Sequence, residues 1–175
     1  SSRMKARFAS LRTPTRLVPL LAMTWLAAPL VQGAALVVPP DLLPGEQYRV
    51  LFVTSTTRNA TSTTIADYNA FVSAAANAEA DFASLGAVWS AVASTAAVSA
   101  RNNTNTNPAN GEGVPIYRPD GLRLAVGNTA FWKCPLVPNP DLTETGTANP
   151  YSLVWTGTSD FGTVVAGQGL GSSNP

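Results

Sequence analysis

The first 35 residues place the strongest constraint on the fold, because their pattern predicts that they are cleaved off. The folded domain must then be built from the remaining residues alone. A basic lead precedes an apolar run of 14 residues, 17–30, and small residues follow at Gly33, Ala34 and Ala35. This order is typical of a cleaved export signal. The basic residues of the lead are Lys5, Arg7, Arg12 and Arg16. We therefore predict a signal peptide over 1–35 and a single exported domain over 36–175, secreted or held in the cell envelope.

An uncleaved membrane anchor is the alternative interpretation of the same segment. A membrane-spanning helix needs about 20 predominantly apolar residues. The run over 17–30 is shorter and contains Pro19, Thr24 and Pro29. We favour the cleaved signal, and we expect no stable transmembrane span in the mature protein.

Removal of the signal reverses the net charge of the chain. The whole sequence has a formal charge of +1, but the part after residue 35 keeps six basic residues against all ten acidic ones, a net charge of about −4. The six basic residues are spread singly along the chain rather than clustered. Binding to nucleic acid needs a basic patch or stripe. We therefore predict no nucleic-acid partner.

The sequence contains no histidine and one cysteine. Without histidine, Ser-His-Asp and Cys-His catalysis and histidine-based zinc sites are excluded. An exported domain with one thiol has no internal disulfide framework. Cys134 is either a reactive or intermolecular thiol or, as we favour, a partly buried small apolar residue.

The clearest secondary-structure signal is one helix over residues 64–80. Apolar residues recur there at helical spacing. Thr64 and Asp67 resemble a capping box, with Asp in the place of the usual Glu. The apolar face comprises Ile65, Tyr68, Phe71, Val72, Ala75 and Ala76.

Strand signals lie on both sides of this helix. Residues 47–54 predict a strand covered on both faces, and 88–94 and 151–155 predict two more. Pro119-Asp120-Gly121 predicts a hairpin turn between 114–118 and 122–126. The fold class is therefore α+β: one principal helix packed on a small, twisted, mostly antiparallel sheet with long loops. We expect an irregular stretch at 127–150, and core or loop positions for Trp89, Trp132 and Trp155.

Short motifs in this chain resemble a family of exported bacterial domains. Tyr117-Arg118-Pro119-Asp120-Gly121 is similar to the family's "RxDG" hairpin, and Val154-Trp155-Thr156-Gly157-Thr158 to its "VWTGT" strand. Trp89 and Ala100-Arg101-Asn102 fit the upstream part of the pattern, so the likeness runs from about residue 47 to 162. The resemblance implies a C-type-lectin-like fold. Many relatives end in a Pro-Glu-Pro (PEP-CTERM) sorting tail.

The chain departs from the family pattern in two places. Trp132-Lys133-Cys134 stands where relatives usually have a Trp-Asp-Gly turn, and the sorting tail is absent. We expect either a C-terminal truncation or a lost tail.

The resemblance also raises the question of calcium, which C-type-lectin-like folds often bind together with sugar. The nearest matches to the usual signatures are Asn139-Pro140-Asp141 and Trp155-Thr156-Gly157. Calcium takes 6–8 oxygen ligands, several of them from acids. Asn139, Asp141 and Glu144 are therefore the candidate metal ligands, and an ordinary solvated turn is the alternative.

These observations favour a non-catalytic surface or extracellular-matrix protein. We predict a structural role or the binding of an extracellular glycan or matrix polymer, and no enzyme activity. A hydrolase acting on envelope polysaccharide is the alternative. It rests on four loop carboxylates, those of Asp120, Asp141, Glu144 and Asp160.

Overall fold

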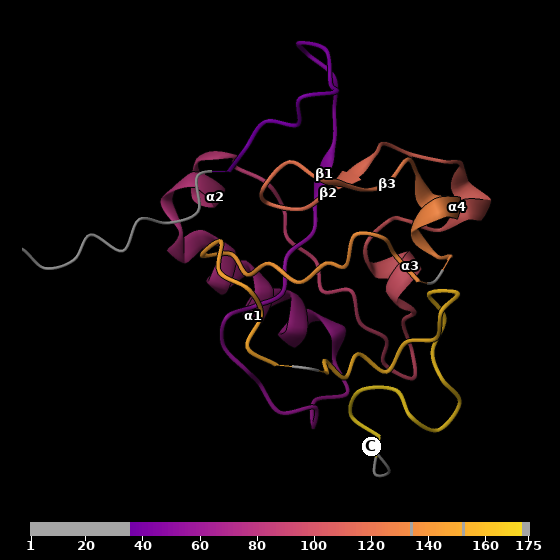
Figure 1. The fold of residues 1–175 in the computed structure, drawn as a ribbon. Coiled ribbons are helices and arrows are strands. Elements are labelled where there is room, and N and C mark those ends of the chain that lie inside the picture. The colour runs from indigo at the N-terminus through magenta and orange to yellow at the C-terminus, as the bar shows by residue number, and fades with distance from the viewer. Residues whose placement is uncertain (1–35, 134, 152, 173–175) are drawn as a thin grey trace, which may run out of the picture. The chain divides into compact units, whose positions relative to one another are not determined.

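The computed structural model describes residues 36–133, 135–151 and 153–172, and these form a mixed α+β unit (Figure 1). The predicted signal over 1–35 and Cys134 lie outside the described residues. Within the described part of the chain, no helix is long and apolar enough to cross a membrane. The predicted α+β class is confirmed: a few helices accompany a small sheet of three strands.

The sheet has the strand order β1-β2-β3, with β2 in the middle. Strand β1 (Arg49–Val50) pairs in parallel with β2 (Ile116–Tyr117), and β2 pairs antiparallel with β3 (Arg123–Ala125). The expectation of a mostly antiparallel sheet is therefore wrong for one of its two pairings. A parallel pair needs a long crossover, and residues 51–115 supply it.

The hairpin predicted around Pro119-Asp120-Gly121 is confirmed as the β2–β3 connection. The main-chain N–H of Gly121 donates to the carbonyl of Arg118 at 3.0 Å, and the N–H of Arg118 donates to the carbonyl of Leu122 at 2.9 Å. Gly121 has φ +80°, which glycine adopts without the steric cost of a side chain. Local turn chemistry therefore accounts for this element.

The predicted principal helix is also confirmed, as α1 (Ile65–Ala78), and the shorter α2 (Ala80–Ser84) follows it. The side chain of Thr64 caps nothing, so the expected capping box is wrong. Ser62 bridges the two residues instead: its hydroxyl oxygen accepts from the N–H of Thr64 at 3.1 Å, and the hydroxyl donates to Asp67 Oδ2 at 2.6 Å. Ser62 thus links the N–H of the N-cap residue to the Asp67 carboxylate, which a capping box would have joined directly.

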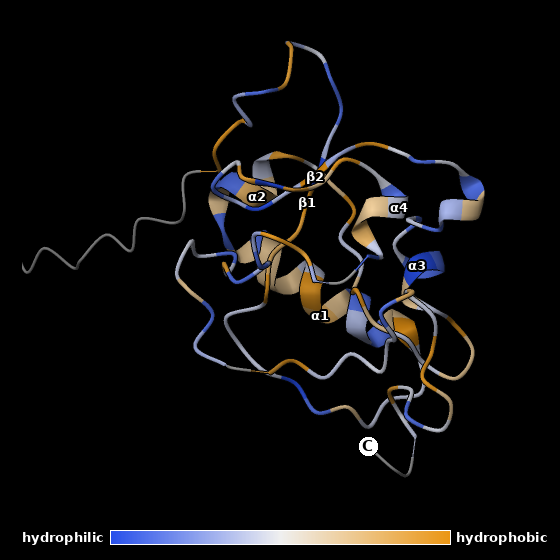
Figure 2. Ribbon diagram, turned by 45° about the vertical axis from the view of Figure 1, so that its right-hand side comes forward, coloured by the Kyte–Doolittle hydropathy of each residue, from blue (hydrophilic) through white to orange (hydrophobic). Residues whose placement is uncertain are grey.

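Three short helical elements complete the secondary structure of the described residues. They are α3 (Ala100–Asn103), the 3₁₀-helix η1 (Pro108–Asn110) and α4 (Asn128–Phe131). In Figures 1 and 2, α2 lies on one side of the sheet and α4 on the other.

The strands expected at 88–94 and 151–155 do not form within the described residues. Trp155 is 50% exposed and lies outside the helices and strands, so it takes the loop position of the two that were expected and not the core position. Trp89 is half-buried and packs against Phe52 and Phe82, with ring centroids 5.4 Å from each. An aromatic anchor at Trp89 is thereby confirmed.

Apolar side chains gather in two clusters, and Figure 2 shows apolar stretches in α1 and around β1 and β2. The first cluster lies against α1 and the second around β2, β3 and α4. The buried members of the first are Tyr68, Ala91, Ala93 and Leu170. Those of the second are Ile116, Leu124, Ala125 and Phe131.

Candidate functional site

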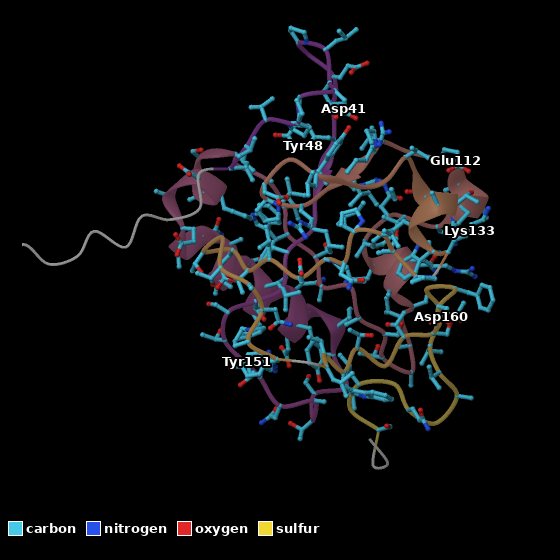
Figure 3. All side chains as sticks on the ribbon, viewed as in Figure 1. Asp41, Tyr48, Glu112, Lys133, Tyr151 and Asp160 are labelled. Carbon is cyan, nitrogen blue, oxygen red and sulfur yellow. The ribbon has the colours of Figure 1, made fainter. Side chains whose placement is uncertain are left out.

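A groove of about 560 Å³ is the candidate site. Its walls come from residues 50–54, which begin at the last residue of β1, from the turn at 139–141 and from the segment 149–160. Tyr151 and Asp160 both line it, and Figure 3 shows these two side chains well apart. The groove is therefore long enough for an extended ligand rather than a single small ion.

The lining combines aromatic surface with uncharged polar groups. Phe52, Trp89, Phe131 and Trp132 supply the aromatic surface besides Tyr151. Hydroxyl and amide groups come from Asn139, Asn149, Thr156, Thr158 and Ser159. Asp141 and Asp160 are the acids, and no basic residue is among the described lining residues. Such a surface offers hydrogen bonds and apolar contact but no partner for an anion.

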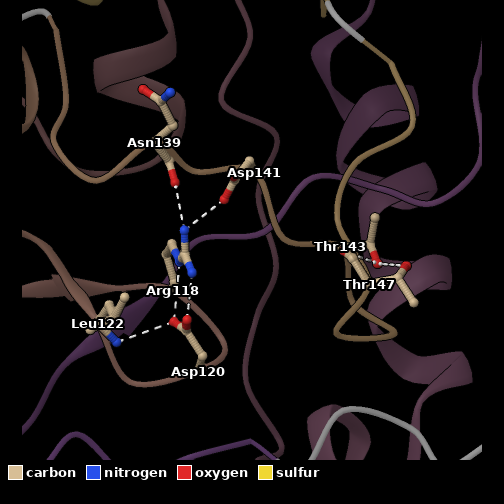
Figure 4. A network of polar contacts seen from close by, with 7 residues as sticks. All are labelled: Arg118, Asp120, Leu122, Asn139, Asp141, Thr143 and Thr147. Atoms are coloured by element: carbon tan, nitrogen blue, oxygen red, sulfur yellow. Dashed lines mark hydrogen bonds and ion pairs between the residues drawn. The ribbon is translucent and has the colours of Figure 1, made fainter.

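Arg118 fixes one wall of the groove (Figure 4). Its guanidinium donates to both carboxylate oxygens of Asp120, at 3.1 and 2.5 Å, within the β2–β3 turn. The Nη1 atom also reaches across to Asp141 Oδ1 at 2.6 Å and to the carbonyl of Asn139 at 3.2 Å. The Arg118 side chain is only 14% exposed. Arg118 of the hairpin motif thus connects the sheet to the turn at 139–141.

The same contacts decide the charge of Asp120. Its hydrogen bonds from Arg118 hold the pKa of the Asp120 carboxyl below its usual value. Asp120 is therefore an ionised acceptor at neutral pH and cannot serve there as a proton donor. Asp120 also does not line the groove. The contacts of Asp120 thus stabilise the β2–β3 turn and do not place its carboxylate at the groove.

Asp120 should make stability depend on pH on the acid side. Its pKa in the folded protein lies below the unfolded value of about 3.9, so its stabilisation is fully present above about pH 5 and is lost as the pH falls through the folded-state pKa. We expect Asp120→Asn to unfold more easily than wild type at pH 7, with the difference shrinking towards about pH 3. Urea denaturation at a series of pH values measures this. An equal difference at every pH contradicts it.

The three candidate metal ligands all have partners within the protein. Asn139 and Asp141 lie together because both contact Arg118. Glu144 is 4% exposed, and its carboxylate accepts from the N–H and the hydroxyl of Ser55. No group of three or more His, Cys, Asp or Glu side chains placed to hold a metal ion occurs among the described residues. Calcium binding by Asn139, Asp141 and Glu144 stays a prediction.

The second family-like motif contributes Thr156 and Thr158 to the lining of the groove. Ser94, which is fully buried, donates its N–H to the carbonyl of Thr156 at 2.9 Å, and its hydroxyl lies 2.9 Å from Thr158 Oγ1. Ser94 Oγ also accepts from the N–H of Ala100 at 2.8 Å. Residues 156–158 are thereby attached to the start of α3. Sequence reasoning missed Ser94, because a serine in a small-residue stretch gives no signal of this role.

Of the four acids considered for hydrolysis, the structure brings only Asp141 and Asp160 to the groove. Asp141 is paired with Arg118, whereas the Asp160 carboxylate has no hydrogen bond or ion pair within the described part of the chain. A second cavity of about 650 Å³ contains none of the predicted site residues, and it shares with the groove Val50, Leu51, Trp89, Ser90, Val92 and Phe131. Of the residues singled out from the sequence for metal binding or hydrolysis, Asn139, Asp141 and Asp160 thus line the groove, and Asp120 and Glu144 do not.

Comparisons with family models, curated proteins and solved structures found no match to this chain.

Proposed function

We propose that this protein is a non-catalytic exported surface or matrix module, C-type-lectin-like in fold, that binds an extended uncharged polysaccharide in the groove. The single observation that carries the proposal is the lining: aromatic side chains beside amides and hydroxyls, with no basic residue among the described ones. The motif resemblance and the α+β class support the fold assignment.

The chemistry of a neutral sugar polymer matches this lining. Each sugar ring presents hydroxyl groups and an apolar face of C–H bonds. Asparagine, serine and threonine can donate to or accept from the hydroxyls, and aromatic rings can cover the apolar face. Asp141 and Asp160 disfavour an acidic polysaccharide by like-charge repulsion.

Tyr151→Ala tests the groove directly. Tyr151 lines it and is 43% exposed, so its ring is accessible to a ligand. We expect binding to neutral polysaccharides, measured by affinity electrophoresis over a panel, to weaken by about tenfold or more. Phe161→Ala is the matched control, because Phe161 is an aromatic residue that is 72% exposed and does not line the groove. Equal weakening in both variants contradicts the proposal, as does the absence of binding to every neutral polysaccharide.

Two further arms of the same experiment address the alternatives. Binding that requires calcium and is lost in Asp141→Ala supports the metal site at Asn139, Asp141 and Glu144. We expect binding to persist in a chelator, because Asp141 and Glu144 already accept from protein donors. Sugar release that stops in Asp141→Asn or Asp160→Asn makes the protein a hydrolase.

A further inference from the structure

Residues 153–155 form an unpaired stretch of apolar chain. Leu153, Val154 and Trp155 are 89%, 55% and 50% exposed. Within the described part of the chain, no main-chain N–H or C=O group of these three residues has a hydrogen-bond partner. Val154 and Trp155 have side chains that favour strands, which is why the sequence predicts a strand here. The segment therefore has the composition of a strand without a neighbouring strand.

The two sides of this segment face different surroundings. Val154, Thr156 and Thr158 line the groove, whereas Leu153 and Trp155 do not. This alternation is that of an extended chain, in which successive side chains point to opposite sides. One side thus belongs to the groove, and the other leaves Leu153 and Trp155 exposed.

We propose that two copies of this protein associate by antiparallel pairing of residues 153–155. An extended backbone is the partner that satisfies a row of free donors and acceptors. A two-fold axis brings the same segment of a second copy to the first, with its own free groups and its own exposed Leu153 and Trp155.

Charge favours a second copy as the occupant. Residues 145–159 contain no Asp, Glu, Lys or Arg, so two copies of the segment face each other without like-charge repulsion. The exposed Leu153 and Trp155 side chains remove apolar surface from water when they meet across the axis. Self-pairing does not rest on the proposed polysaccharide binding, because it is argued from the free main-chain groups and from Leu153 and Trp155, which do not line the groove.

Sedimentation velocity of the purified exported protein over a concentration series tests the proposal. We expect a reversible monomer–dimer equilibrium in the wild type. Trp155→Lys places two positive charges near the axis and removes apolar contact, and should raise the dissociation constant by about tenfold or more. Phe161→Lys is the control, because it adds the same charge at an aromatic residue that is 72% exposed outside the segment. A wild-type protein that stays monomeric throughout, or equal weakening by both variants, overturns the proposal.

Amide hydrogen exchange on the unmodified protein gives a readout that needs no substitution. Pairing protects the N–H groups that point towards the second copy. We therefore expect amide exchange within residues 153–155 to slow as the protein concentration rises. Exchange there that is independent of concentration, in samples that sedimentation shows to be dimeric, places the dimer contact elsewhere and overturns the pairing.

Discussion

Gly157→Ala is expected to lower the free energy of unfolding by about 3–5 kcal/mol. Gly157 is buried in the second family-like motif and has φ +65°, a conformation that costs other residues about 1–2 kcal/mol. A Cβ atom there would also lie 2.8 Å from Leu170 N and 2.8 Å from Ser94 O. Both are main-chain atoms, which cannot move aside as a flexible side chain would. Chemical denaturation of the purified variant measures the loss.

Gly167→Ala separates the two causes. Gly167 has φ +72°, close to that of Gly157, but nothing lies within 4 Å of its added Cβ. It should therefore cost only the conformational part, about 1–2 kcal/mol. Equal losses in the two variants would show that close packing at residue 157 contributes nothing.

Phe82→Ala is the second substitution with a large expected effect, a loss of about 3–5 kcal/mol. Phe82 in α2 is 0% exposed, and its ring packs 5.2 Å from that of Phe52 and 5.4 Å from that of Trp89. Truncation removes apolar contact and leaves a cavity that these neighbours fill only in part. Thermal or urea unfolding gives the value.

The matched control for Phe82 is the same substitution at Phe161, which is 72% exposed. We expect Phe161→Ala to change stability by about 0.5 kcal/mol or less. Because Phe52 and Trp89 line the groove, Phe82→Ala should also weaken any groove ligand, whereas Phe161→Ala should not. A small stability loss at Phe82 would contradict the aromatic cluster as a source of stability.

The elements that the sequence predicted well are those with local causes. Helix α1 follows from apolar spacing within its own 14 residues, and the β2–β3 hairpin from a Pro-Asp-Gly turn. The capping box expected at Thr64 and Asp67 was wrong, because the sequence could not show that the Ser62 hydroxyl accepts from the N–H of Thr64 and donates to Asp67. The net charge and the absence of histidine follow from the sequence alone, and each excludes a class of function without reference to the structure.

The candidate site was predicted only in part. Asn139 and Asp141 do line the groove, but the sequence could not show that Arg118 already engages both. Glu144 is near them in sequence, yet its carboxylate faces Ser55, 89 residues away along the chain. Uncharged lining residues such as Thr156 and Asn149 belong to no ligand motif, so no sequence signal marked them.

The sequence by itself determined the helix, the hairpin and the α+β class, because each depends on interactions between residues close together in the chain. Tertiary structure alone decided the parallel pairing of β1 with β2, the exposure of Trp155 and the convergence of 50–54, 139–141 and 149–160 on one groove. The physical reason is that strand pairing and burial depend on which segments, distant in the sequence, pack next to each other in the fold. Residues 151–155 have the composition of a strand, but a strand forms only when another backbone takes up its free N–H and C=O groups.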